Sequence, residues 1–248
     1  MKRIATLASL LLAASVSFAK EETVTFKSGT ETVSAFLAKP DGTGPFPGVI
    51  VLHEWWGLDA WVKDQARALA KEGYAALALD LYRGKVTASP EEAHQLMMGT
   101  PVDRQTRDMK AAFAFLAGRK DVLKTKIASI GWCMGGRNSL TLAIEELTLA
   151  AAVVYYGAPP TDPASIAKIK APILGNFGGD DQGPSPAQAK EFEAAVKKAG
   201  KTIDLKIYTG APHAFANPNN PWKGYRKDAA NDAWNRTTSF LRHYLMSR

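Results

Sequence analysis

The sequence predicts an α/β fold with a mainly parallel central sheet, an N-terminal antiparallel hairpin and flanking helices. Short continuous apolar runs such as Val49–Leu52 are typical of strands that are buried on both faces. Amphipathic helical patterns separate most of these runs, and alternating strands and helices favour a parallel sheet. The 248 residues are 46% hydrophobic and 22% charged, which is enough apolar material for one large core. Because no repeat or linker divides the chain, we expect residues 20–248 to form a single domain.

Residues 1–19 have the pattern of a secretory signal peptide. Lys2 and Arg3 precede a mostly apolar run, and the small residues Ser17 and Ala19 offer a cleavage site. The apolar run is about 15 residues long, shorter than the roughly 20 that span a bilayer, although a membrane-anchored helix is the alternative. We therefore expect an exported protein, periplasmic or secreted, that starts at Lys20 and has no stable membrane insertion.

The charge of the chain is moderate and spread along its length. The formal net charge is +7, and removal of Lys2 and Arg3 with the signal peptide leaves +5. The basic residues are scattered rather than clustered, which does not fit a nucleic-acid-binding surface. We expect a small-molecule partner and no nucleic acid.

The strands can be placed in order from the N-terminus. Residues 23–39 alternate apolar and polar side chains around Ser28 and Gly29, which predicts an antiparallel hairpin. A loop rich in glycine and proline follows. Ligands in parallel sheets bind at the carboxyl ends of strands, so functional residues are expected directly after each apolar run. The predicted buried strands are Val49–Leu52, Ala75–Leu79, Ile127–Ile130, Ala151–Tyr155, Pro172–Leu174 and Ile203–Tyr208.

Helices are predicted where capping residues frame an apolar stripe. Asp59 is placed to cap a helix after the first buried strand. Ser185 and Gln188 form a capping box at the start of a later helix. Another helix is expected over residues 134–144, and a last long helix over residues 226–245.

The stretch GWCMGG lies between a predicted strand and a predicted helix and holds the only cysteine of the chain. Gly131, Cys133 and Gly135 fit G-x-C-x-G, the cysteine form of the nucleophile elbow. In such a turn the nucleophile has a strained backbone, and side chains at the glycine positions would clash with the strand and the helix. The helix N-terminus also favours negative charge on the sulfur. A packing turn with a buried thiol is the alternative, and the strand–turn–helix context favours the nucleophile.

A thiolate nucleophile needs a base, and the base needs an orienting acid. In this type of fold the acid and then the histidine follow the nucleophile in the chain. His213 directly follows the last predicted strand, whereas His243 lies in the final helix and is expected to be a surface or packing residue. The stretch GGDDQG offers both Asp180 and Asp181 as the acid. The pattern of residues alone does not choose between these two aspartates.

His53 and Glu54 end the first buried strand. The zinc motif H-E-x-x-H would need a histidine where the chain has Gly57, so no metal is expected, and no organic cofactor either. Glu54 is expected to face the same region as Cys133. An acid at such a place is expected to pair with another group.

Taken together, five stretches resemble the dienelactone hydrolase family, whose members are cysteine hydrolases with the α/β-hydrolase fold. The resemblance runs from about residue 22 to the C-terminus. As an ordered set these stretches are specific, although each alone would be weak. They are VIVLHEWWGL, GYAALALDLY, IGWCMGGR, FGGDDQG and APHAF.

The resemblance implies a role for each candidate residue. Cys133 matches the nucleophile, His213 the base, and Asp181 rather than Asp180 the orienting acid. Glu54 matches a glutamate that holds the resting thiol by a hydrogen bond until substrate displaces it.

The resemblance also implies an oxyanion hole that is made by the backbone N–H groups of Met134 and Trp55. It implies no metal or organic cofactor.

The chain departs from the family where dienelactone-cleaving members use two arginines to grip a substrate carboxylate. The two positions hold Pro90 and Asn217 in this chain, and an aromatic pair of the family corresponds to His94 and Met97. Arg83 and Arg137 lie near the motifs, and the sequence does not place them relative to the pocket.

These observations favour an exported cysteine hydrolase that cleaves an ester or lactone through an acyl-enzyme, with neutral substrates preferred to dienelactone. A non-catalytic small-molecule-binding protein that kept the hydrolase cleft is the alternative. A thiol redox role ranks last because the chain has no second cysteine to resolve an oxidised thiol.

Overall fold

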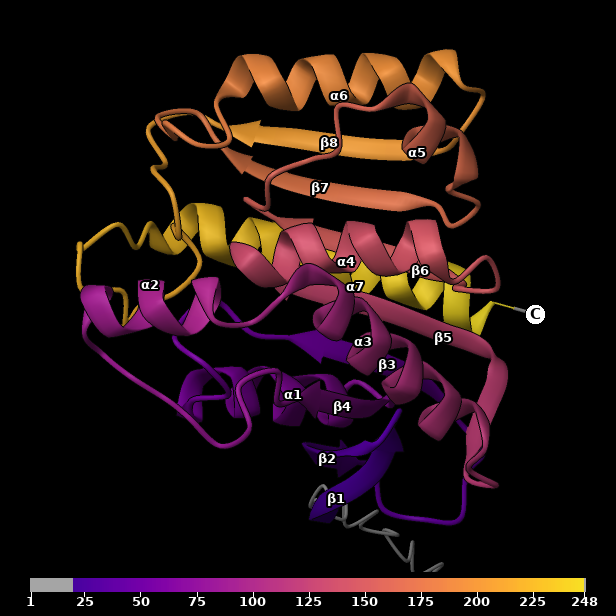
Figure 1. Ribbon diagram of the computed structural model, residues 1–248. Coiled ribbons are helices and arrows are strands. Elements are labelled where there is room, and N and C mark those ends of the chain that lie inside the picture. Colours follow the sequence, from indigo (N-terminus) through magenta and orange to yellow (C-terminus); the bar gives the residue numbers. More distant parts are fainter. Residues whose placement is uncertain (1–19, 248) are drawn as a thin grey trace, which may run out of the picture.

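A mixed eight-stranded sheet runs through the centre of the protein in a computed structural model that describes residues 20–247 (Figure 1). The predicted signal peptide, residues 1–19, lies outside the described residues. The strands are β1 (Lys20–Ser28), β2 (Glu31–Lys39), β3 (Phe46–Leu52), β4 (Ala75–Leu79), β5 (Val122–Trp132), β6 (Ala151–Tyr155), β7 (Ile173–Gly178) and β8 (Ile203–Tyr208).

The strand order confirms the predicted α/β architecture. Across the sheet the order is β1-β2-β4-β3-β5-β6-β7-β8. β1 and β2 form the predicted antiparallel hairpin, and β2 is also antiparallel to β4. The other neighbouring pairs are parallel, from β4–β3 to β7–β8. The carboxyl ends of β3, β5, β6, β7 and β8 therefore meet at one edge of the sheet, as the sequence predicted for the functional side.

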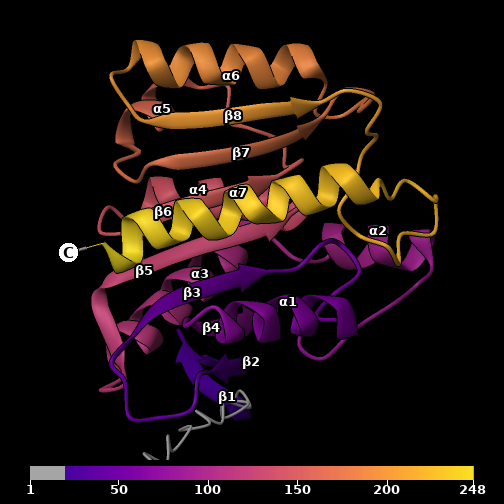
Figure 2. The same ribbon diagram turned by 180° about the vertical axis from the view of Figure 1, so that it is seen from behind.

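Helices cover both faces of this sheet, and each face has its own apolar layer. The helices are α1 (Ala60–Lys71), α2 (Pro90–Met98), α3 (Val102–Ala117), α4 (Met134–Glu145), α5 (Pro163–Lys168), α6 (Pro186–Lys198) and α7 (Lys227–Met246). Side chains of α3, α4, α5 and α6 belong to one buried apolar cluster, and those of α1 and α7 to the other. Figure 2 shows α7 lying along the back of the sheet, on the face opposite α4.

The helix ends follow the predicted capping chemistry. The Asp59 side chain accepts a hydrogen bond from the backbone N–H of Val62 at the start of α1. Ser185 and Gln188 form the complete capping box of α6, in which each side chain bonds the backbone of the other residue. These contacts satisfy backbone donors that a helix N-terminus otherwise leaves without partners.

Two strands differ most from the sequence expectation. The strand predicted at Pro172–Leu174 begins one residue later and continues to Gly178, because Gly175 and Gly178 interrupt the apolar run without interrupting the strand. The strand predicted at Ile127–Ile130 is the end of β5, whose first half is more polar and partly exposed. Both differences arise because strand pairing continues through residues that carry no apolar side chain.

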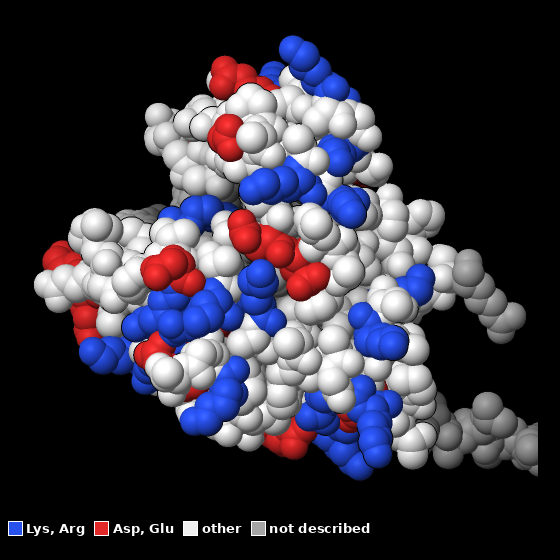
Figure 3. All heavy atoms as spheres, turned by 45° about the vertical axis from the view of Figure 1, so that its right-hand side comes forward, with Lys and Arg blue, Asp and Glu red and all other residues white. Residues whose placement is uncertain are grey.

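The surface carries both signs of charge. Figure 3 shows Lys and Arg side chains interspersed with Asp and Glu over one face of the protein. Many of these groups form ion pairs, for example Arg67 with Glu21 and Arg119 with Asp121. Among the described helices, none has the length and apolar character that a membrane crossing requires.

Candidate active site

The single cysteine occupies a strained turn between β5 and α4. Cys133 has φ 53° and ψ −116°, in a region that side-chain-bearing residues seldom adopt. A Cβ on Gly131 would lie 2.0 Å from the carbonyl oxygen of Gly135, and one on Gly135 would lie 2.1 Å from the carbonyl oxygen of Leu52. Both positions therefore require glycine, as the elbow pattern predicted. The turn leaves the thiol half-buried at the N-terminus of α4.

His213 and Asp181 lie together, although 32 residues separate them in the chain. Nδ1 of His213 is 2.8 Å from Oδ2 of Asp181, and the Asp181 carboxylate is almost completely buried. The other carboxylate oxygen accepts a hydrogen bond from the backbone N–H of Gly183 at 2.8 Å. These two contacts fix the Asp181 carboxylate so that it orients the imidazole ring.

Asp180, the neighbouring candidate, is exposed and takes no part in this contact. Its backbone N–H donates to the carbonyl oxygen of Ala211, which turns the chain at the end of β7. The geometry thus separates two aspartates that the residue pattern could not distinguish, in the direction that the resemblance implied.

The electrostatic environment of His213 favours its protonated form. Burial lowers the pKa of the imidazole, but hydrogen bonding and charge interactions with Asp181 and Cys133 outweigh this effect and raise the pKa to about 10. A positively charged imidazole beside a thiol is the setting in which a cysteine acts as a thiolate nucleophile.

Glu54 is buried in the same pocket and makes a contact that the sequence did not predict. Its Oε2 accepts a hydrogen bond of 2.7 Å from Nδ2 of Asn217, and both residues are 2% exposed. Burial raises the pKa of the Glu54 carboxyl to about 7, against the opposing effects of the Asn217 hydrogen bond and of His213. Within residues 20–247, Glu54 has no hydrogen bond to Cys133, so the thiol contact implied by the resemblance is replaced by one to Asn217.

The two backbone N–H groups expected to form an oxyanion hole are free to do so. Met134 is the first residue of α4, and Trp55 lies in the turn after β3. Within the described part of the chain neither N–H donates a hydrogen bond to another residue. The side chains of both residues line the pocket that holds Cys133.

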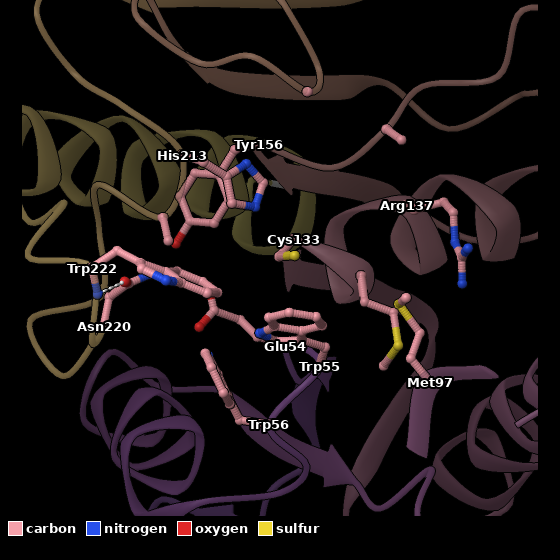
Figure 4. A pocket seen from close by; sticks show the side chains of 14 residues that line it. Glu54, Trp55, Trp56, Met97, Cys133, Arg137, Tyr156, His213, Asn220 and Trp222 are labelled. Carbon is pink, nitrogen blue, oxygen red and sulfur yellow. Dashed lines mark hydrogen bonds between the residues drawn. The ribbon is translucent and has the colours of Figure 1, made fainter. Parts of the chain in front are cut away.

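A cavity of about 350 Å³ brings these groups together at the carboxyl edge of the sheet (Figure 4). Trp55, Trp56 and Trp222 form an aromatic cluster on its wall, with ring centroids 5.1 to 5.6 Å apart. Met97 of α2 also lines the cavity. The walls are mainly apolar around a few polar groups, which is the usual character of a small-molecule site.

The positions of the family's carboxylate clamp hold no cation. Pro90 begins α2 and does not line the cavity, and Asn217 is committed to Glu54. Arg83 does not line the cavity, and its guanidinium pairs with the buried carboxylate of Asp108 at 2.7 Å.

Arg137 does line the cavity, and its guanidinium is drawn on the side away from Trp222 in Figure 4. It bonds the side-chain oxygens of Gln105 and Asn138 at 3.3 and 3.5 Å. Among residues 20–247 it forms no ion pair with a carboxylate. Of the aromatic pair's replacements, Met97 lines the cavity and His94 is exposed.

The remaining histidines have structural or surface positions. His53 is completely buried, its Nε2 accepts a hydrogen bond from the backbone N–H of Leu81, and burial lowers its pKa. His243 is exposed on α7, as expected. The part of the chain that the structure describes contains no group of three or more His, Cys, Asp or Glu residues placed to hold a metal ion.

Sequence reasoning missed several residues of the pocket, among them Tyr156, Asn220 and Trp222. Tyr156 directly follows β6, so the expectation of functional residues after each apolar run could have found it. Like Cys133, it has a positive φ, here 39°, and such strain gathers at functional sites. Asn220 and Trp222 lie in an irregular loop after His213, where no periodic pattern gives a signal.

Comparison with known proteins gives a consistent result. The sequence profile of the dienelactone hydrolase family matches residues 33–245. A candidate carboxymethylenebutenolidase of Saccharolobus solfataricus is 36% identical over 90% of this chain and 98% of its own length. A candidate 2-oxo-3-(5-oxofuran-2-ylidene)propanoate lactonase of Bradyrhizobium is 32% identical over 88% of this chain and 92% of its own length. The crystal structure of a candidate dienelactone hydrolase from Klebsiella pneumoniae superposes with a TM-score of 0.83 and 26% identity, covering 91% of this chain and 99% of that one.

Proposed function

The chain belongs to the dienelactone hydrolase family and is a hydrolase of that type, and we propose that it cleaves an ester or lactone with Cys133 as nucleophile. The observation that carries the proposal is the 2.8 Å contact between His213 and the buried Asp181, in a pocket that also holds the strained Cys133. A nucleophile, a base and a group that orients the base are the parts that acyl transfer needs.

In the first half of the reaction, the Cys133 thiolate attacks the substrate carbonyl carbon. The carbonyl oxygen becomes an oxyanion that the free N–H groups of Met134 and Trp55 stabilise. When the tetrahedral species collapses, the C–O bond to the leaving group breaks, and protonated His213 gives its proton to the departing oxygen. The product of this half is a thioester on Cys133 and a free alcohol, or a tethered hydroxyl in the case of a lactone.

In the second half, water replaces the alcohol. Neutral His213 takes a proton from the water, whose oxygen attacks the thioester carbonyl in the same oxyanion hole. The carbon–sulfur bond then breaks, and the carboxylic acid leaves with the thiolate–imidazolium pair restored. Both half-reactions use only residues of this chain and the substrate water, and neither needs a metal or an organic cofactor.

A non-catalytic binding protein is the competing function. Such a protein would have no reason to keep the buried Asp181 aimed at His213, because that contact orients a ring without enclosing a ligand. An assay of the purified chain against a panel of neutral esters, lactones and dienelactone separates the two functions. Binding of panel members without turnover of any would establish the non-catalytic alternative.

We expect dienelactone to be a poor substrate compared with a neutral lactone or short-chain ester. A half-buried substrate carboxylate needs a cation, usually a bidentate arginine, and Pro90 and Asn217 supply none at the clamp positions. An unpaired carboxylate would lower kcat/KM by about a hundredfold, on the scale of a few kcal/mol. The measurement is kcat/KM for dienelactone against a neutral ester with a comparable leaving group.

Arg137 provides the sharpest control for this substrate preference. Arg137 lines the cavity and carries a guanidinium, so it is the residue that could replace the clamp. If the wild type prefers dienelactone and Arg137→Met loses that preference, the carboxylate is bound by Arg137 and the neutral-substrate proposal is wrong.

We further propose that residues 1–19 direct export and are removed before Lys20. The support is the pattern of a basic start, a short apolar run and small residues at the cleavage site. Expression of the full chain in a bacterium should place the protein in the periplasm or medium with Lys20 as its first residue. A chain that stays in the cytoplasm with an intact N-terminus would contradict the proposal.

A further inference from the structure

The Asn217 side chain is held in one orientation by its own loop. Its Oδ1 accepts a hydrogen bond of 2.9 Å from the backbone N–H of Asn219. An amide has one oxygen and one nitrogen, so this contact leaves Nδ2 as the group that faces Glu54. Nδ2 is 2.7 Å from Oε2 of Glu54, and both side chains are almost completely buried. The loop therefore presents a donor, and not an acceptor, to the buried carboxyl.

The Asn217 amide donates the one well-aligned hydrogen bond of the Glu54 carboxyl among the described residues. The Tyr156 hydroxyl lies near the same carboxyl and lowers its pKa, but neither this hydroxyl nor Oε1 of Glu54 has a partner in good hydrogen-bonding geometry. The Asn217 bond therefore positions the carboxyl, because its loss would leave only the poorly aligned Tyr156 hydroxyl as a donor. Cys133 lines the same cavity and interacts instead with His213.

We propose that Asn217 is a positioning residue that holds the Glu54 carboxyl away from the Cys133 thiol and so leaves the thiol to His213 before any substrate binds. The proposal rests on the proposed role of Cys133 as the reacting group. The resting thiol needs no substrate to displace Glu54 from it, so neutral esters and lactones find the nucleophile already paired with its base.

Several titratable groups face Glu54 and set the conditions of a test. His213 approaches from the loop after β8, Asp59 from the start of α1, and Tyr156 from the end of β6. Cys133 at the start of α4 lines the same cavity. The neighbouring His53 is buried, and its ring bonds the Glu54 carbonyl oxygen. Any pH dependence assigned to Glu54 must therefore disappear when Glu54 itself is replaced.

Alkylation of the single cysteine by iodoacetamide reads out the state of the thiol without any ester substrate. The Cys133 sulfur attacks the methylene carbon, a carbon–sulfur bond forms and iodide leaves, so mass measurement gives the rate at each pH. In the wild type we expect the alkylation rate to change in a step near pH 7, the pH at which Glu54 changes its charge. In Asn217→Leu the carboxyl loses its donor, and the step should move upward by about one to two pH units.

The same variant should react more slowly at neutral pH. Without its donor the carboxyl is protonated there, and a buried O–H group needs an acceptor, for which the Cys133 sulfur is available in the cavity. A thiol that is hydrogen-bonded to Glu54 is no longer paired with His213, so we expect alkylation about tenfold slower. Asn217→Asp tests the same point with the loop preserved, because its carboxyl still accepts from Asn219 but replaces the neutral donor with a second carboxyl. Two buried carboxyls side by side share one proton, which also moves the titration of the pair upward.

Asn219→Leu is the matched control, since this side chain is exposed and only its backbone N–H is used. It should keep the wild-type rate and pH step. The decisive comparison repeats Asn217→Leu in a Glu54→Ala background, where a residue that acts through Glu54 has no remaining effect. An unchanged pH step in folded Asn217→Leu and Asn217→Asp, or an equal loss of rate in the Glu54→Ala background, would overturn the proposal. Because no ester is used, a failed hydrolysis assay would leave this result interpretable.

Discussion

The Cys133→Ala variant is expected to lose at least about 10⁴-fold in kcat for any ester or lactone that the wild type hydrolyses. The chain has one cysteine, so no second thiol can replace the missing nucleophile. The substitution removes one half-buried sulfur and keeps a Cβ at the strained position, so the fold should remain intact. Initial rates and the thermal unfolding midpoint of both proteins provide the measurement.

A residual activity is expected even without the thiol. The free N–H groups of Met134 and Trp55 can still polarise a bound carbonyl, and such contributions persist when the nucleophile of a hydrolase is removed. A variant that is folded and keeps a tenth of wild-type turnover would show that another group attacks the substrate. In that case Cys133 would be a packing residue of the turn, which was the alternative considered from the sequence.

Much of the architecture could be predicted because the pattern of apolar residues in each strand matches the burial of that strand in the sheet. Continuous apolar runs mark the parallel strands, since helices bury both faces of the sheet. The alternation of the first strands marks the hairpin, where β1 lies at an edge and is largely exposed. The helices α2 and α3 were not located by their apolar patterns. α2 is capped by Ser89 and begins with Pro90, but Ala93 is its only buried residue, so it carries almost no apolar stripe. α3 begins after Pro101 without any side-chain cap.

The positions of the proposed reacting groups could be located in the sequence, because an elbow needs glycines at fixed positions and the remaining groups follow particular strands. Gly131 and Gly135 are required by contacts as short as 2.0 and 2.1 Å, which is why the pattern in the sequence is specific. The choice between Asp180 and Asp181 depended on the resemblance, because both residues follow the same strand. Their side chains differ only in direction, and direction is a property of the folded loop.

The Glu54–Asn217 pair could not be predicted from local patterns. The two residues are 163 positions apart and belong to different loops at the edge of the sheet. In the sequence, Asn217 is notable only because the family has an arginine at this position. Its proposed role follows from the contact with the Asn219 backbone, which orients the amide so that its nitrogen donates a hydrogen bond to Glu54. Loop conformation, which periodicity does not report, decides such pairings.

The Asp181→Asn variant should have the second-largest effect, a loss of about 10³- to 10⁴-fold in kcat. The backbone N–H of Gly183 donates to one oxygen of Asp181, so an asparagine keeps that oxygen in place and turns its NH₂ group toward His213. The Nδ1 atom of the ring must then accept a hydrogen bond, and the ring proton moves to Nε2. A ring in this tautomer cannot take the proton of the thiol, and without the carboxylate its pKa also falls from about 10 toward the ordinary value.

Asp180→Asn is the matched control for this prediction, because it makes the same chemical change one residue away on an exposed side chain. Its backbone contact to Ala211 does not involve the carboxylate, so its kcat should stay within about twofold of the wild type. The pH profile adds a readout that loss of stability would not produce. In the pH profile of kcat/KM, Asp181→Asn should move the limb that reflects the titration of His213 to lower pH. Asp180→Asn should leave that limb in place. Equal losses in the two variants, or a larger loss in Asp180→Asn, would show that the 2.8 Å contact between Asp181 and His213 does not orient the base.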